Sequence, residues 1–204
     1  MSDGTEHRKL AAIMFTDMVG YTALTQGDEK LALELLEEHR RLLRELFPKF
    51  NGREIETTGD GFLVEFASAL EAARCAIEIQ GALASRNISV PPERQIQVRI
   101  GIHVGDVVHK DGHVWGDGVK IAARLQPLAE PGGICISVDV ARQIQHNLEA
   151  SVVKMGEREL KNVKLPMEIC RIVLPWEKKE TSSVERRASP LLDKVSPLAL
   201  ATVT

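Results

Sequence analysis

The stretch EIETTGDGFLVEF, centred on Gly59-Asp60-Gly61, constrains the fold more than any other short segment of the chain. Apolar and β-branched residues flank it on both sides, and Asp-Gly between two such runs is the strongest short signal for a β-hairpin. We therefore expect antiparallel strands at residues 53–57 and 62–66. A lone carboxylate held between two glycines also suits a binding site, provided that a second carboxylate lies nearby.

Hydrophobic periodicity predicts the remaining elements. The apolar run from Leu10 to Phe15 has the length of a buried strand, and leucines at helical spacing predict a helix over 28–47 that ends before Pro48. Residues 96–109 alternate between apolar and polar side chains, which predicts a half-buried strand that continues into a second one. The other expected elements are helices at 68–86, 118–128 and 138–146 and strands at 134–137, 152–160 and 167–174.

The order of these elements indicates the fold class and the domain organisation. Strands alternate with helices and hairpins join some of them, so we expect an α/β (α+β) fold in which a mixed sheet carries helices packed on one face. The 204 residues, of which 44% are hydrophobic, suffice for one substantial core. We expect a flexible lead-in at 1–8, one domain at 9–175, and a disordered tail at 176–204, where Lys, Glu, Ser, Arg and Pro dominate.

The charge pattern excludes several classes of partner. The net charge is −3 and acids and bases are mixed along the chain, so we expect no nucleic-acid partner and no membrane surface. No apolar run approaches the roughly 20 residues of a membrane-spanning helix. The opening residues MSDGTEHRKL are polar and unlike a signal peptide, so the expected location is cytoplasmic.

Cysteine and histidine residues do not form metal-binding patterns in the sequence. The cysteines lie far apart in apolar stretches, which predicts buried free thiols in a reducing compartment. They are Cys75, Cys135 and Cys170. The histidines other than His113 show no metal-ligand spacing and are expected to be structural, among them His39, His103 and His109.

Asp17 and Asp60 each stand at the end of an apolar strand. If those strands are neighbours in one sheet, the two carboxylates meet at one edge, where they repel each other unless a cation lies between them. Hard oxygen ligands with open positions suit Mg²⁺ bound together with substrate phosphates. Gly59 and Gly61 would then let the backbone approach a phosphate chain. The alternative is that each aspartate only caps a helix or a turn.

Four segments, FTDMVGYT, TTGDGFLVEF, RIGIHVGDVV and VWGDGVKIAARL, occur in this order. Their order and spacing closely resemble the class III adenylate and guanylate cyclases, and PGGICIS and GERELKNVKLP resemble the bacterial single-domain members. The similarity covers about residues 9–174 and identifies the 9–175 domain as a cyclase catalytic domain. It implies the class III cyclase fold with a ferredoxin-like core. It also implies a head-to-tail homodimer that converts ATP or GTP into the 3′,5′-cyclic monophosphate and pyrophosphate for cyclic-nucleotide signalling.

The resemblance also implies roles for individual residues. It makes Asp17 and Asp60, with the backbone carbonyl of Met18, the ligands of two Mg²⁺ or Mn²⁺ ions that activate the ribose 3′-hydroxyl and hold the triphosphate. Arg124 matches the arginine that neutralises charge in the transition state. The turn that leads into the following helix is a natural seat for phosphate, and its substrate-binding residues are Gly20, Tyr21 and Thr22.

Three positions depart from the commonest adenylate cyclase pattern. Glu56 replaces the lysine that reads adenine, His113 replaces its aspartate partner, and Lys120 replaces the asparagine that orients the ribose. Guanylate cyclases resemble this chain at the first position, where they also have glutamate. A carboxylate accepts from the guanine N1 and N2 donors, but it also accepts from the adenine N6 amine. Both ATP and GTP therefore remain open as the substrate.

Two classes of function follow from these departures. Lys120 keeps a donor and adds charge, but it cannot accept from the ribose as an amide does, so it either contacts the triphosphate or weakens turnover. Retention of Asp17, Asp60 and Arg124 favours an active cyclase over a catalytically impaired homology domain that binds nucleotide or a partner. A diguanylate cyclase is disfavoured because the chain has no Gly-Gly-Asp/Glu-Glu-Phe signature, and a P-loop enzyme because it has no GxxxxGK[ST].

Overall fold

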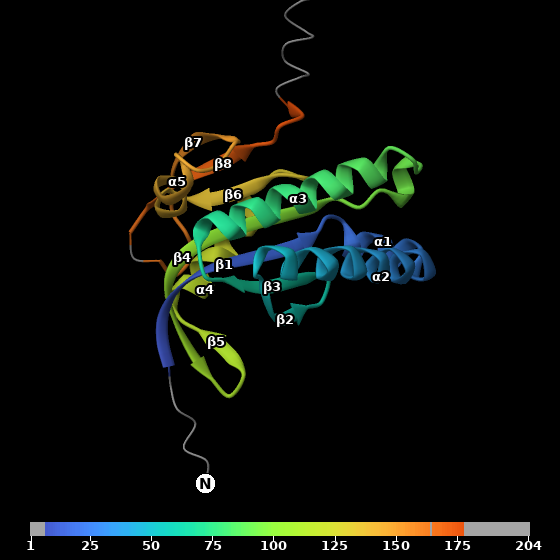
Figure 1. Ribbon diagram of the computed structural model, residues 1–204. Helices are drawn as coiled ribbons and strands as arrows, with labels where there is room; N and C mark the ends of the chain where they lie inside the picture. The colour runs from blue at the N-terminus through green and yellow to red at the C-terminus, as the bar shows by residue number, and fades with distance from the viewer. Residues whose placement is uncertain (1–6, 164, 178–204) are drawn as a thin grey trace, which may run out of the picture. The chain divides into compact units, whose positions relative to one another are not determined.

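The computed structural model describes residues 7–163 and 165–177, and Figure 1 shows their arrangement. A compact unit extends through Leu174. The expected tail, 176–204, lies almost wholly outside the described residues. Of the expected lead-in, residues 1–6 also lie outside them, whereas residues 7 and 8 belong to the first strand. No helix in the described part of the chain is both long and apolar enough to cross a membrane.

The predicted helices and strands agree with the structure to within three residues at each boundary. The structure adds the short elements α1, η1 and η2, and β5 is the second strand expected after residues 96–109. In chain order the elements are β1 (His7–Met18), α1 (Tyr21–Gly27), α2 (Glu29–Leu46), η1 (Phe47–Phe50), β2 (Arg53–Thr58), β3 (Gly61–Phe66), α3 (Ala69–Asn87), η2 (Pro92–Arg94), β4 (Val98–Lys110), β5 (His113–Trp115), α4 (Asp117–Leu125), η3 (Gln126–Leu128), β6 (Ile134–Ser137), α5 (Val138–Ile144), β7 (Ser151–Arg158) and β8 (Met167–Val173).

The strands form one sheet in the order β2-β3-β1-β4-β6-β8-β7, with β5 paired to the outer part of β4. The β4–β6 pair is parallel and the other pairs are antiparallel. The hairpin predicted around Gly59-Asp60-Gly61 is confirmed, since β2 and β3 pair with Thr58 opposite Gly61. A register shift between Glu54 and Glu56 marks a bulge in β2. The predicted mixed α+β sheet is therefore confirmed.

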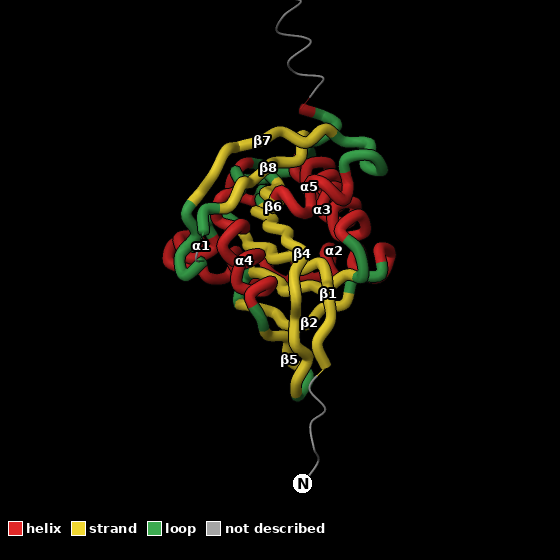
Figure 2. The backbone as a smooth tube through the Cα atoms, turned by 90° about the vertical axis from the view of Figure 1, so that its left-hand side faces the viewer, coloured by secondary structure: helices red, strands yellow, loops and turns green. Residues whose placement is uncertain are grey.

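Alternate side chains of β1 point to opposite faces of the sheet. Met14 belongs to the main core, beneath α2, α3 and α5, whereas Ile13 packs in a second cluster with Leu63 and with Ala122 of α4. Figure 2 shows α3 and α5 on one side of the strands and α4 on the other. The expectation that helices cover one face thus holds for α2, α3 and α5 but not for α4. The periodicity of α4 shows that one of its sides is apolar but does not show which face of the sheet it covers.

Gly101 in β4 explains how closely the segment after α4 approaches the sheet. A Cβ at this position would collide with the backbone nitrogen of Gln126, the first residue of η3. Only glycine therefore allows η3 to lie directly against β4.

Polar side chains fix the starts of two helices at the predicted residues. Asp28 caps α2, where its carboxylate accepts a hydrogen bond from the Leu31 N–H at 3.0 Å. Ser68 caps α3, where its hydroxyl accepts from the Glu71 N–H at 3.2 Å. Such caps satisfy backbone donors that have no partner within the helix. The three cysteines are buried free thiols, as expected.

Candidate active site

The edge of the sheet where β1 ends and β3 begins brings Asp17 and Asp60 together. Asp17 lies opposite Gly61 in the β1–β3 register, and the Met18 N–H donates a hydrogen bond of 3.2 Å to the Asp60 carbonyl. Both aspartates are partly exposed. The expectation that two strand ends place these residues at one edge is therefore met by the antiparallel pairing of β1 with β3.

The electrostatics of this edge suit a cation. Burial raises the pKa of the Asp17 carboxyl, and the neighbouring Asp60 charge raises it further. Burial also raises the pKa of Asp60. A raised pKa means that the negative charge is held less favourably here than in water, so a positive ion between the carboxylates would relieve the cost. Two partly buried carboxylates are hard oxygen ligands of the kind that Mg²⁺ and Mn²⁺ prefer.

Further ligands for such an ion must come from outside this carboxylate pair. Among the described residues, no group of three or more His, Cys, Asp or Glu side chains has an arrangement that could hold a metal ion. Backbone carbonyls, water and substrate phosphates are the remaining oxygen donors, as is usual where Mg²⁺ binds together with a nucleotide.

Two residues that the sequence analysis missed lie beside Asp17. Arg99 of β4 is its register partner, and the Arg99 guanidinium lowers the pKa of Asp17. The amide of Gln126 lowers the same pKa by hydrogen bonding. Within the described structure, Arg99 Nε and Gln126 Nε2 are buried and have no hydrogen-bond partner of ordinary geometry, so the Gln126 contact is a loose one. Arg99 opens the segment RIGIHVGDVV and Gln126 directly follows VWGDGVKIAARL, but only the tertiary structure places the two residues beside Asp17.

The glycines at this edge serve two different purposes. Gly20 (φ 75°) and Gly59 (φ 66°) have left-handed backbones, and a Cβ at either position would meet open space. Gly61 was expected to let the backbone approach phosphate. A Cβ there would collide with the Thr16 carbonyl of β1, so strand packing by itself requires this glycine, and its role toward phosphate stays a prediction. Tyr21, which follows Gly20, begins helix α1.

The other predicted site residues lie elsewhere in the chain and are exposed. Glu56 pairs with Leu63 across the β2–β3 hairpin, which places it on the face of the sheet that α4 covers. His113 lies on β5, and Lys120 and Arg124 lie on α4. Lys120 Nζ is 3.0 Å from the Asp117 carboxylate. In the part of the chain that the structure describes, no hydrogen bond or ion pair joins these side chains to either aspartate of the pair.

The remaining histidines fit a structural role. His39 of α2 is fully buried, its ring centroid lies 5.6 Å from that of Phe62, and burial together with Arg40 lowers its pKa to about 4. His103 forms a 2.8 Å hydrogen bond with the Ser137 hydroxyl.

Comparison with known proteins gives the class to which this fold and site belong. The model of the family described as adenylate and guanylate cyclase catalytic domain matches residues 5–173. A putative adenylate cyclase 3 of Rhizobium meliloti is 39% identical over 170 residues, covering 83% of this chain and 29% of that protein. The chain therefore belongs to the adenylate and guanylate cyclase catalytic domain family.

Solved structures agree with this assignment. The adenylate/guanylate cyclase/hydrolase from Silicibacter pomeroyi is 38% identical with a TM-score of 0.78, covering 83% of this chain and 99% of that one. The guanylate cyclase domain of RhGC from Catenaria anguillulae, solved in complex with GTP, is 19% identical with a TM-score of 0.70, covering 83% of this chain and 98% of that one. The second likeness concerns the fold alone. The predicted family and class III cyclase fold are thus confirmed.

Proposed function

We propose that this chain is the catalytic domain of a purine nucleotide cyclase. It converts ATP or GTP into the 3′,5′-cyclic monophosphate and pyrophosphate, in a head-to-tail homodimer that serves cyclic-nucleotide signalling. The observation that carries the proposal is the pairing of Asp17 and Asp60 at adjacent strand ends, where each carboxyl has a raised pKa. Family membership supplies the reaction class.

Asp17 and Asp60, with the Met18 carbonyl, would hold two Mg²⁺ or Mn²⁺ ions. Bound divalent ions supply positive charge to the triphosphate and lower the pKa of a coordinated hydroxyl. The partly buried carboxylates fit this role because each gains from a neighbouring cation.

The reaction joins the ribose 3′-oxygen to the α-phosphorus while the bond from that phosphorus to the β-bridging oxygen breaks and pyrophosphate leaves. The 3′-hydroxyl proton passes to water. Arg99 lies beside Asp17, and its Nε has no hydrogen-bond partner among the described residues. Its guanidinium can therefore donate to a phosphate oxygen. The open backbones at Gly20 and Gly59 leave room for the phosphates.

The turn after β1 offers further donors to the triphosphate. The first hydrogen bond of α1 runs from the Leu24 N–H to the Gly20 carbonyl at 3.0 Å. The N–H groups of Tyr21 and Thr22 therefore have no partner of their own within the helix, and they can donate to phosphate oxygens.

The second chain of the homodimer would complete each site. Glu56 and His113 read the purine, Lys120 contacts the triphosphate, and Arg124 neutralises charge in the transition state. The proposal is supported by the exposure of all four side chains in one chain and by their lack of any bond to the aspartate pair in the described residues. A donor such as His113 suits guanine O6 or adenine N1, so both bases fit.

Turnover by the purified protein tests the proposal directly. The protein is incubated with ATP or GTP and Mg²⁺ or Mn²⁺, and the cyclic product is separated by chromatography. We expect a cyclic product from at least one nucleotide and none without a divalent ion. Saturable nucleotide binding without any product would favour the alternative, a catalytically impaired homology domain with a regulatory role.

A further inference from the structure

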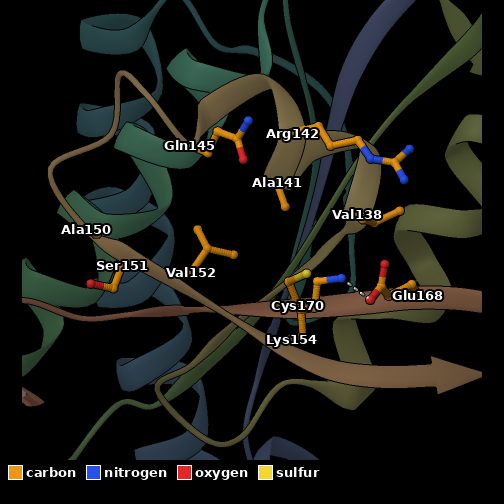
Figure 3. Close-up of a pocket in the computed structure, with 10 residues that line it drawn as sticks. All are labelled: Val138, Ala141, Arg142, Gln145, Ala150, Ser151, Val152, Lys154, Glu168 and Cys170. Atoms are coloured by element: carbon orange, nitrogen blue, oxygen red, sulfur yellow. Dashed lines mark hydrogen bonds and ion pairs between the residues drawn. The ribbon is translucent and has the colours of Figure 1, made fainter.

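A cavity of about 640 Å³ lies between α5 and the last two strands of the sheet, β7 and β8 (Figure 3). None of its lining residues belongs to the candidate active site. Helix α5 lines one side of the cavity, and the edge strand β7 with its neighbour β8 lines the other. Its volume falls within the range of small-molecule sites, which is roughly 300–1,000 Å³.

The inner part of the cavity is apolar. Ala141 of α5 and Val152 of β7 point into the same space in Figure 3, and Cys170 of β8 lies beside them. Lys154 and Cys170 are register partners, so their side chains share the α5 face of the sheet. Burial raises the pKa of the Cys170 thiol, which is therefore neutral and adds to the apolar surface.

The rim of the cavity carries an excess of positive charge. Arg142 and Lys154 contribute two cations, and Glu168 contributes the one carboxylate among the lining residues. Lys154 Nζ lies 2.7 Å from the Glu168 carboxylate, which is a close ion pair. Arg142 has a longer and weaker ion pair, at 3.6 Å from the carboxylate of Asp139, and Asp139 does not line the cavity. Arg142 is thus the more available cation.

We propose that this cavity binds a small amphipathic anion, with an apolar body against Ala141 and Val152 and a carboxylate or phosphate at Arg142. Lys154 provides a second, weaker contact to the anionic group. An exposed ion pair such as Arg142–Asp139 contributes little stability, so a ligand anion displaces Asp139 at small cost. An arginine–anion pair can form two parallel hydrogen bonds, which makes it the stronger contact.

The experiment uses the full chain and three probes with the same eight-carbon body: octanoate, octyl phosphate and octanol. Binding is followed by calorimetry and by ¹H–¹⁵N chemical-shift changes. We expect saturable binding of at least one of the two anions, with shifts at Ala141 and Val152, and at least tenfold weaker binding of octanol. The two anionic arms distinguish a carboxylate ligand from a phosphate ligand. Equal affinity for octanol, or no saturable binding of either anion, overturns the proposal.

Variants at the rim locate the anionic group. Arg142→Ala is expected to weaken binding of the preferred anion about tenfold, as for loss of one charge-assisted hydrogen bond, and Lys154→Ala less. Arg142→Lys should recover part of the loss. Lys49→Ala, on η1 and outside the cavity, is the matched control and should bind as the wild type does. Unchanged affinity in both Arg142→Ala and Lys154→Ala overturns the assignment.

A variant that fills the cavity separates the site from general surface binding. Ala141→Leu adds volume against Val152 and should abolish binding of the anion while circular dichroism shows a folded chain. If that variant does not fold, Ala141→Val provides the smaller change, and at least threefold weaker binding is expected. Unaltered binding in a folded variant of either kind contradicts the proposal.

Discussion

Asp17 and Asp60 lie partly buried at a strand pair whose register a backbone hydrogen bond fixes. Lys120 and Arg124 lie instead on the exposed side of α4, and His113 lies on a strand of only three residues. The first region is therefore arranged by the fold of one chain. Within the described residues of one chain, no hydrogen bond or ion pair joins the second region to the two aspartates. The carboxylate edge, formed by Asp17 and Asp60, is therefore preorganised within one chain, while the position of the other groups relative to it is left open by that chain.

The largest expected effect comes from removing the carboxylate edge. Asp17→Ala or Asp60→Ala should lower kcat/KM at least 10²-fold, because the site loses a ligand for the divalent ions. Binding of Mn²⁺, followed by electron paramagnetic resonance, should weaken in parallel. Glu45→Ala, which removes an exposed carboxylate from α2, is the control and should retain wild-type activity. Full activity of either aspartate variant at saturating substrate would show that catalysis occurs elsewhere.

The next effect concerns the exposed region and its choice of base. In Glu56→Lys/His113→Asp, lysine donates to adenine N1 and aspartate accepts from N6, whereas guanine presents the opposite groups and both would be mispaired. Two mispaired buried groups cost about 1–3 kcal/mol each, so the ratio of kcat/KM for ATP to that for GTP should rise roughly 30-fold or more. An unchanged ratio in a folded and active variant would mean that these side chains do not read the base.

A mixing experiment tests whether the two regions meet across a dimer. A chain with Asp17→Ala/Asp60→Ala is combined with an equal amount of an Arg124→Ala chain. With random pairing, about half of the dimers are heterodimers with one intact site each, so roughly a quarter of wild-type activity should return. Absence of recovery, when labelled subunits demonstrably exchange, would rule out shared sites.

The smallest effect on activity, but a measurable one on stability, comes from the buried His39, which packs against Phe62 of β3. Its folded-state pKa of about 4 lies below the ordinary value of 6.5, so the unfolded chain binds the proton more readily. The free energy of unfolding should therefore be unaffected by His39 above about pH 6.5 and fall by about 3 kcal/mol as the pH drops to about 4.

Urea unfolding across this pH range measures the effect of His39. His39→Leu should lose that part of the pH dependence, whereas the control His146→Leu, at an exposed position, should keep it. Identical pH profiles for the wild type and His39→Leu would contradict the assignment.

The carboxylate edge could be predicted because it depends on local signals. The Asp-Gly turn and the apolar strands on either side specify a hairpin, and a strand-end aspartate follows from the run that precedes it. Arg99 could not be found in this way, since its place opposite Asp17 depends on the register of two strands far apart in sequence. The start of β1 at His7 was missed for the same reason: pairing with His109 extends the strand through polar residues.

The position of α4 could not be predicted either. The spacing of its apolar residues shows that α4 has one apolar side, but that side can be buried against either face of the sheet. Two glycines of β4 leave room for the helical segment on this face: a Cβ at Gly101 would collide with Gln126 of η3, and one at Gly105 would lie 3.0 Å from Gly118 of α4. Neither contact can be foreseen before the position of α4 is known.

The absence of a side chain at Gly101 restricts which substitutions the chain tolerates at this position. A methyl group at position 101 would push η3 away from β4 and carry Gln126 away from Asp17, although Gly101 itself contacts neither carboxylate group. In a library of single substitutions scored for cyclase activity, Gly101 should therefore rank beside the aspartates in intolerance. The arrangement of the carboxylate edge thus depends on a residue that has no side chain and contributes no chemical group.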